Sequence, residues 1–175
     1  MLRTSALLVV FMLASAPAVA TDRVVLSLAQ LHQAADAVAV GRLDNSDGEW
    51  LDGRILTRHQ FTATEVWAGD GIKAKQRFEL TTLGGIVGEI GQRVSGQVLL
   101  PGAGAELAMF LVWDPKSVSY RLVGMSQGVF NVKRAAGETD GLVLRDQFAP
   151  NVDQESPILT LAKLRQRVRE LEREK

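Results

Sequence analysis

The segment Glu106–Trp113, with the sequence ELAMFLVW, decides the fold expected for this chain. From Leu107 onward it is apolar at odd and even positions alike, whereas a strand with one solvent-exposed face alternates between apolar and polar residues. Asp114 and Pro115 follow with residues typical of turns. The segment therefore predicts a central strand that is covered on both faces.

Shorter strand patterns lie on both sides of this segment. Apolar and turn-forming residues predict further strands at 37–43, 55–67, 77–82, 120–123, 129–132 and 142–144. In the strand at 55–67, Ile55, Phe61 and Trp67 lie at odd positions and are expected to form one buried face. In the strand at 77–82, Phe78 and Leu80 are expected to point inward, and Arg77, Glu79 and Thr81 outward. Since no helical crossover separates these strands, they favour antiparallel pairing in a small barrel or sandwich.

A helix is expected at each end of the strand region. Ser27 and Gln30 match a capping box and predict a short helix over 28–35. A second helix is expected over 156–175, because Ser156 and Pro157 suit its N-cap and first position. Its apolar residues recur at helical spacing: Leu161, Leu164, Val168 and Leu171. This stripe is too short for a coiled coil, so the helix is expected to dock on the sheet rather than to dimerise.

Residues 1–20 have the pattern of a Sec-type signal peptide. Arg3 gives a positively charged start, 6–16 is an apolar run too short to span a membrane, and 18–20 (Ala-Val-Ala) is a small-x-small cleavage site. A buried N-terminal helix is the alternative. We expect cleavage before Thr21, one β domain over 21–155, and a periplasmic or secreted product without a membrane span.

The composition excludes several classes of chemistry. The chain has no cysteine, so disulfides, thiolate metal sites, cysteine nucleophiles and a lipoprotein anchor are absent. Its 20 basic and 20 acidic residues cancel, which removes any global attraction to nucleic acid or acidic lipid. His32 and His59 are too few for a zinc site, which usually takes three protein ligands. Neither a cofactor nor a metal is expected.

The sequence Gly124–Gly128, GMSQG, matches the G-x-S-x-G nucleophile elbow. No histidine follows Ser126, and the residues after Gly128 alternate as a strand instead of forming the helix of an elbow. The reverse order of His59, Asp114 and Ser126 is formally possible, but the chain is short for it. We therefore expect a β-bulge with two glycines and no catalytic residue. A small serine hydrolase that uses Ser126 is the alternative function.

The run 44–48, DNSDG, is dense in turn-forming residues and predicts a turn after the strand at 37–43. With Glu49 and Asp52 it could also offer oxygen ligands to calcium, which takes six to eight of them. Gly48 is out of register for an EF-hand loop. An acidic hairpin loop is the interpretation that we prefer.

The segment Gly84–Gly104 holds seven of the sixteen glycines. A phosphate-binding loop needs a helix N-terminus and usually a lysine, and this segment offers neither. Two interpretations stay open. The segment is a long connection that presents Ile86, Val87 and Ile90 to a protein partner, or it is a bulged strand pair that buries them.

Three stretches, 35–41 (ADAVAVG), 61–69 (FTATEVWAG) and 106–112 (ELAMFLV), resemble netrin-like and tissue-inhibitor-type domains. Two others, 83–88 (LGGIVG) and 124–130 (GMSQGVF), resemble uncharacterised exported bacterial proteins associated with secreted metallopeptidases. The resemblance implies an OB-like barrel and a role as an inhibitor or accessory factor. Tissue inhibitors chelate zinc through an N-terminal cysteine, whereas the expected mature terminus here is Thr21, so no site residue is transferred.

The expected fold is thus mainly β, a small antiparallel OB-like barrel with a short N-terminal helix and an amphipathic C-terminal helix. The expected function is that of an exported, monomeric, non-catalytic protein-binding module whose candidate contact residues are Ile86, Val87 and Ile90. A secreted metallopeptidase or another exported protein is the expected partner. A structural protein of the cell envelope is a further alternative to the serine hydrolase.

Overall fold

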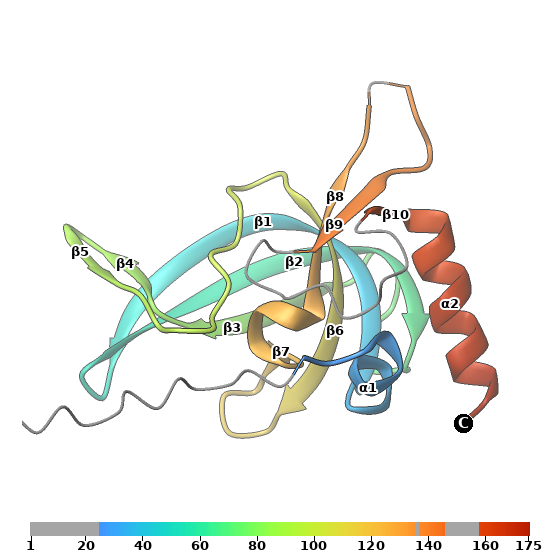
Figure 1. The fold of residues 1–175 in the computed structure, drawn as a ribbon. Helices are drawn as coiled ribbons and strands as arrows, with labels where there is room; N and C mark the ends of the chain where they lie inside the picture. Colours follow the sequence, from blue (N-terminus) through green and yellow to red (C-terminus); the bar gives the residue numbers. More distant parts are fainter. Residues whose placement is uncertain (1–24, 136, 146–157) are drawn as a thin grey trace, which may run out of the picture.

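The computed structural model describes residues 25–135, 137–145 and 158–175. As predicted, the chain is mainly β, with a short helix near the N-terminus and another at the C-terminus (Figure 1). The elements are α1 (Leu28–Gln33), β1 (Ala37–Leu51), β2 (Arg54–Ala68), β3 (Arg77–Leu83), β4 (Gly85–Val87), β5 (Ile90–Gln92), β6 (Glu106–Asp114), β7 (Ser119–Leu122), η1 (Met125–Gly128), β8 (Val129–Lys133), β9 (Leu142–Arg145), β10 (Ile158–Thr160) and α2 (Leu161–Arg173). The expected signal peptide at 1–20 lies outside the described residues.

Eight strands form one sheet in the order β1-β2-β3-β7-β6-β8-β9-β10, and β1 also pairs with β6. β4 and β5 form a separate two-stranded sheet. All pairings are antiparallel except that of β3 with β7, which meet in parallel at Leu80 and Tyr120. The expectation of purely antiparallel pairing is wrong at this point. Since β1, β2, β3, β7 and β6 are five strands whose pairings return to β1, their directions cannot alternate throughout.

β6 is buried on both faces, as its sequence predicts. Leu107, Met109 and Leu111 belong to a first apolar core between the strands. Ala108 and Phe110, on the opposite face, belong to a second core under the helices. The first residues of β1, Ala37–Val40, alternate between the two cores in the same way. These two strands are therefore the wall that separates the cores.

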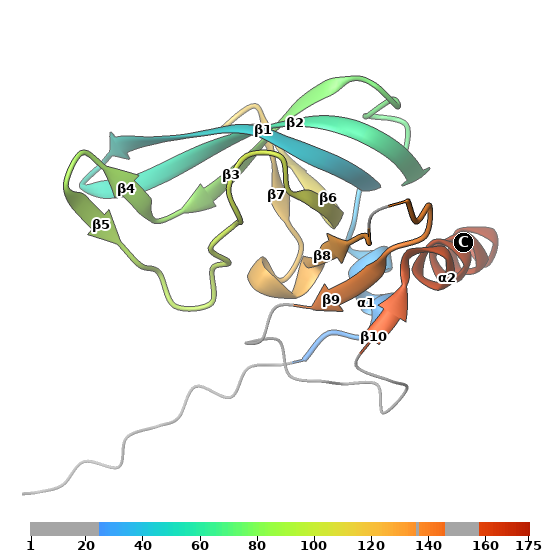
Figure 2. The same cartoon turned by 90° about the horizontal axis from the view of Figure 1, so that it is seen from above.

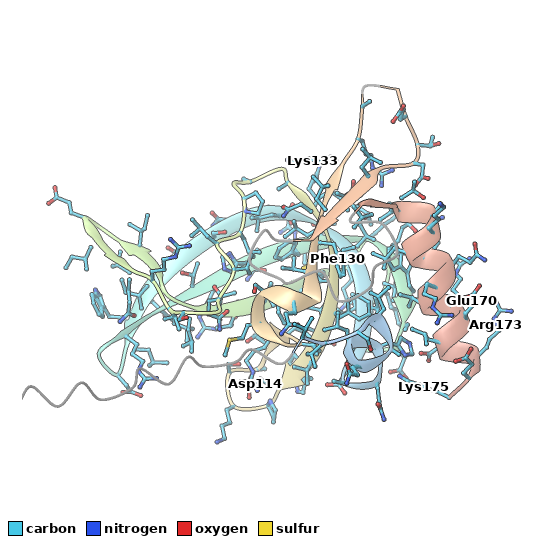
Figure 3. The ribbon with its side chains drawn as sticks, in the orientation of Figure 1. Asp114, Phe130, Lys133, Glu170, Arg173 and Lys175 are labelled. Carbon is cyan, nitrogen blue, oxygen red and sulfur yellow. The ribbon has the colours of Figure 1, made fainter. Side chains whose placement is uncertain are left out.

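The second core is closed by α2, whose predicted stripe of Leu161, Leu164, Val168 and Leu171 is buried. The helix docks on its own sheet, and Figure 3 shows Arg173 and Lys175 at its C-terminal end. It begins at Leu161 rather than near Ser156, because Ile158–Thr160 pair with β9 and the Thr160 hydroxyl caps Lys163 N at 3.3 Å. Ser156 and Pro157 lie outside the described residues. Within the described residues no helix has the length and apolarity that crossing a membrane requires.

The turn expected at 44–48 is wrong, since β1 continues through it to Leu51. These residues pair with β2 from Asn45 to Leu51, and a register shift between Leu43 and Asn45 accommodates the extra residue. The chain instead turns at Asp52 and Gly53, both of which have positive φ. Pairing with a long partner strand has overridden the local preference for a turn.

In β2 and β3 the predicted inward faces are confirmed, with Ile55, Phe61, Phe78 and Leu80 buried. Thr81, expected to point outward, is also buried. Its hydroxyl lies 2.7 Å from that of Ser119 on the neighbouring β7, which satisfies both groups. The presence of β7 beside β3 is the reason why the simple alternation fails at this residue.

The β4–β5 hairpin lies across the far half of β1 and β2, at the end of the molecule opposite α2 (Figures 1 and 2). It approaches β1 at Gly48, where a Cβ atom would overlap the carbonyl oxygen of Ile86. Val87 Cγ2 would lie 3.2 Å from that added atom. The bare Cα of Gly48 thus provides the surface on which the hairpin packs.

Replacing Gly48 by alanine should displace this hairpin. We expect Gly48→Ala to lower the free energy of unfolding by about 1–3 kcal/mol, the usual effect of overpacking. Urea unfolding of this variant and of Gly102→Ala provides the measurement, since nothing lies within 4 Å of a Cβ added at Gly102. The control should stay within about 0.5 kcal/mol of the wild type. Equal stability of the two variants would contradict the packing of β4 on Gly48.

Candidate binding surface

Three hydrogen bonds fix the β4–β5 hairpin to β2. Gly84 N donates to the carbonyl oxygen of Ile55 at 2.7 Å, and the buried hydroxyl of Thr57 donates to the carbonyl oxygen of Gly84 at 2.7 Å. On the other hairpin strand, Gln92 Oε1 accepts from Ile55 N at 2.6 Å. Gly84 has a φ of 87°, which suits glycine at this junction. The start of the segment Gly84–Gly104 is therefore a fixed strand pair.

The exposed large apolar side chains of the hairpin are those of Ile86 and Ile90, which are 69% and 57% accessible. Val87 is half-buried where it approaches Gly48. The strand-pair interpretation was thus correct for the backbone, but wrong in burying these aliphatic side chains. Ile86 and Ile90 are free to contact a partner, whereas Val87 contributes to the packing of the hairpin.

Two more large apolar side chains are exposed on the last two residues of β1, directly before its turn to β2. Figures 1 and 2 show this turn at the same end of the molecule as the β4–β5 hairpin. Trp50 is 49% and Leu51 51% accessible. The sequence analysis missed them because it placed a turn at 44–48. The signal that points to them is a bulky apolar pair directly before Asp52-Gly53, a typical hairpin turn. We call Trp50, Leu51, Ile86 and Ile90 the tip surface. These residues lie at one end of the molecule, and the pairing of Ile86 with Gly91 and of Val87 with Ile90 places the two isoleucines on opposite faces of the hairpin.

The other exposed large apolar side chains are distributed over four segments of the chain. They come from the connection after β5, the β6–β7 hairpin, η1 and β9: Leu99, Trp113, Val118, Met125 and Leu142. Single exposed apolar residues are common on protein surfaces, whereas several at one end of a molecule indicate an interaction site. The tip surface is therefore the strongest candidate.

The acidic residues predicted to form a hairpin loop are instead spread along β1. Asp44 accepts a hydrogen bond from the Thr62 hydroxyl at 2.6 Å, and Glu49 accepts one from Arg58 at 2.8 Å. In the part of the chain that the structure describes, no three His, Asp or Glu side chains come together in a way that could hold a metal ion. An extended strand separates the carboxylates that a loop would have gathered.

His59 lies on the buried face of β2 between two hydroxyl groups. Its Nδ1 is 2.7 Å from Ser46 Oγ and its Nε2 is 2.9 Å from Thr82 Oγ1. Burial lowers the pKa of His59 from 6.5 to about 4, so the ring is neutral at physiological pH. A histidine that activates a serine must accept a proton and is usually oriented by a carboxylate. Here the second nitrogen meets a hydroxyl, and the low pKa makes a weak base.

Ser126 lies in η1, a single 3₁₀ turn, and not in the expected β-bulge. The turn separates β7 from β8, both of which pair with β6, and it is entered with positive φ at Gly124 and Met125. Ser126 is 1% accessible, and its hydroxyl has no hydrogen-bond partner among the described residues. A substrate would have no access to this hydroxyl.

The structure does not assemble His59, Asp114 and Ser126 into a triad. Both ring nitrogens of His59 face the hydroxyls of Ser46 and Thr82. Asp114 accepts from Lys116 N at 3.1 Å and lies 3.3 Å from Arg121 Nε, at the end of β6 (Figure 3). The three side chains are therefore engaged in separate contacts.

Comparison of the chain with protein-family models, with curated proteins and with solved structures found no match. The resemblance to netrin-like domains and to exported bacterial proteins therefore stays a prediction. The function has to be argued from the geometry of the tip surface.

The buried His59 should make the protein less stable in acid. Because its pKa is lowered in the folded state, the unfolded state binds the proton more readily between about pH 6.5 and 4. The stability present above pH 6.5 is then lost as the pH falls, by up to about 3 kcal/mol from this residue alone. Urea unfolding at several pH values should show this loss in the wild type and a smaller one in His59→Gln. An NMR titration of the His59 ring with a midpoint near 6.5 would contradict the argument.

Proposed function

We propose that this chain is an exported, non-catalytic protein-binding module that holds its partner at the tip surface. The observation that carries the proposal is the exposure of Ile86 and Ile90 on a hairpin that Thr57 and Gln92 fix to the sheet. These aliphatic side chains are mostly exposed to solvent, although their support is fixed. They suit a surface that another protein covers.

The composition of the tip surface supports this proposal energetically. Each isoleucine contributes about 1.5–3 kcal/mol when it is fully buried. Trp50 belongs to the residue type most enriched among binding hot spots. Because the hairpin is already ordered, binding does not have to immobilise a loop, a step that costs about 0.5–1.5 kcal/mol for each rotamer-rich side chain. The tip surface therefore combines apolar area with a low ordering cost.

We infer that the sheet forms a small OB-like barrel. The sequence of pairings from β1 through β2, β3, β7 and β6 back to β1 supports this inference. So does the first core, which receives side chains from all five strands. Small barrels present their binding residues on or near the connections between strands. The tip surface lies on the β4–β5 hairpin, within the connection from β3 to β6, and on the last residues of β1 before its turn to β2.

Export to the periplasm or the medium is supported by the pattern of residues 1–20. The proposed partner is a secreted metallopeptidase or another exported protein, and this part rests on the resemblance of 83–88 and 124–130 alone. The proposal includes neither a cofactor nor a nucleic acid. It describes a monomer, since the apolar stripe of α2 is used within the chain.

The export proposal predicts a defined N-terminus. Mass spectrometry of the protein recovered from the periplasm or the medium should find Thr21 as the first residue, because 18–20 present the small side chains that the peptidase requires. Recovery of the protein from either fraction with Met1 intact would contradict the proposal.

The binding proposal predicts that Ile86→Ser and Ile90→Ser, singly and together, reduce partner capture without unfolding the protein. Both side chains are already exposed, so the melting temperature should change little, while buried aliphatic truncations usually lose more than about 1 kcal/mol. The measurement is the recovery of interacting proteins from the periplasm and medium by tagged wild type and variants, followed by a binding isotherm with the purified partner.

Leu99→Ser provides the matched control, because Leu99 is an 83% exposed aliphatic residue outside the tip surface. It should bind the same partner as the wild type. A large drop in melting temperature for Ile86→Ser or Ile90→Ser would show that these side chains are packed. Unchanged affinity for the purified partner would place the contact elsewhere on the molecule.

A further inference from the structure

β1 is longer than the strand that covers its outer edge. β6 pairs with Ala37–Arg42, and the connection before β6 continues this contact through Leu43, whose N–H and C=O bond to Ala105 and Gly104 at 2.8 and 2.7 Å. From Asn45 to Leu51, β2 is the one described strand with which β1 pairs. The far half of β1 is therefore an edge strand on one side.

The main-chain groups at this edge follow from the pairing of β2. Ile55 uses its N–H and C=O for Gln92 and Gly84, on the side away from β1. Its partner Trp50 is thus in a non-hydrogen-bonded pair and directs its own N–H and C=O away from β2. By alternation, Ser46 and Gly48, opposite His59 and Thr57, do the same. These three residues present main-chain donors and acceptors at the open edge.

The side chains along the edge divide by face, since successive residues of a strand point to opposite sides. One face carries Ser46, Gly48 and Trp50, which is the face on which the β4–β5 hairpin packs. The other carries Asn45, Asp47 and Glu49. Glu49 contacts Arg58 at 2.8 Å, and the same guanidinium contacts Glu79 at 2.6 Å. The Asp47 carboxylate has no hydrogen bond or ion pair within the described residues. In addition to Arg58, β2 places Arg54 on this face, opposite Leu51, so the negative charge on β1 is concentrated at Asp47 and Glu49 along the edge.

We propose that the edge Asn45–Leu51 accepts an extended segment of the partner protein as an additional antiparallel or parallel strand, with basic side chains at alternate positions and apolar ones between them. The inference rests on the proposed protein-binding function and specifies how the partner docks. Main-chain hydrogen bonds to Ser46, Gly48 and Trp50 hold the segment, as in other cases of strand addition. Its basic residues lie beside Asp47 and Glu49, and its apolar residues lie beside Trp50 and the hairpin.

The charges also select against a second copy of this chain as the occupant. An antiparallel pair of two such edges centred on Gly48 would place Asp47 of each copy opposite Glu49 of the other. Like charges in directly opposed positions destabilise a sheet. Acidic side chains on an edge strand thus prevent self-association, and they favour a strand of opposite charge.

Hydrogen exchange of the ¹⁵N-labelled protein tests this inference, with a capped heptapeptide of alternating lysine and valine as the probe. In the free protein the amides of Ser46, Gly48 and Trp50 should exchange rapidly, whereas those of Asp47 and Glu49, bonded to β2, should be protected. Saturating peptide should slow the first three by at least about tenfold and leave the other two unchanged. Protection of the three amides without peptide, or no change with it, would overturn the inference.

Charge reversal supplies the specificity control. Asp47→Lys should weaken binding of the Lys/Val peptide by about tenfold, whereas Glu138→Lys, an exposed change between β8 and β9, should have no effect. A heptapeptide of alternating glutamate and valine should not protect the edge of the wild type. Equal protection by both peptides would show that the edge does not select basic segments, which contradicts the proposal.

The test of strand addition and the test of the proposed binding function can fail independently of each other. The variant with both Ile86→Ser and Ile90→Ser retains the main-chain groups of the edge and Trp50, so a saturating amount of the Lys/Val peptide should still protect its edge amides, at a higher peptide concentration than the wild type needs because apolar contact with the hairpin is lost. If that variant no longer binds the partner and the peptide does not protect the wild-type edge, the results support binding at the tip surface and contradict strand addition. If the peptide protects the edge and the same variant keeps its full affinity for the partner, the results support strand addition and contradict partner binding through the tip surface.

Discussion

The burial of both faces of β6 is the constraint on which the rest of the structure depends. Leu107, Met109 and Leu111 have to be covered on one side, and Ala108 and Phe110 on the other. The strands curl over the first side, while α1 and α2 cover the second. A strand with two apolar faces also needs neighbours along its edges, and β1, β7 and β8 supply them. The positions of β1, β7, β8 and the two helices follow from these contacts.

The tip of the molecule arises because β1 and β2 extend beyond this buried wall. Beyond Leu43, β1 no longer pairs with β6. There the β4–β5 hairpin covers one face of the β1–β2 strand pair. The inner face there is partly polar, and its groups satisfy one another: Thr57 with the hairpin, and His59 with Ser46 and Thr82. The same extension therefore produces the fixed hairpin, the exposed apolar residues and the open strand edge.

The parts of this fold that the sequence predicts are those where burial is set by close neighbours in the chain. The double-faced β6, the inward face of β2 and the stripe of α2 are of this kind. The far half of β1 is different, because Asp44–Gly48 favour a turn locally and become a strand only through pairing with β2. The contact of Ser46 with His59 depends on the register after the shift at Asp44, and a slip of one residue would move Ser46 to the other face. Trp50 and Leu51 were missed for the same reason.

The distribution of chemical groups favours binding over catalysis as the use of this architecture. The side chains with reactive groups, Ser126 and His59, are buried, and the exposed tip offers apolar side chains and main-chain hydrogen-bonding groups. Main-chain bonds to a partner strand are nearly independent of the partner's sequence, so they supply affinity without specificity. Specificity then has to come from alternate side chains along the edge. Such an alternation exists along this edge, with Asp47 and Glu49 on one face and Trp50 and the hairpin on the other. It favours a segment of alternating basic and apolar residues over a second copy of the chain.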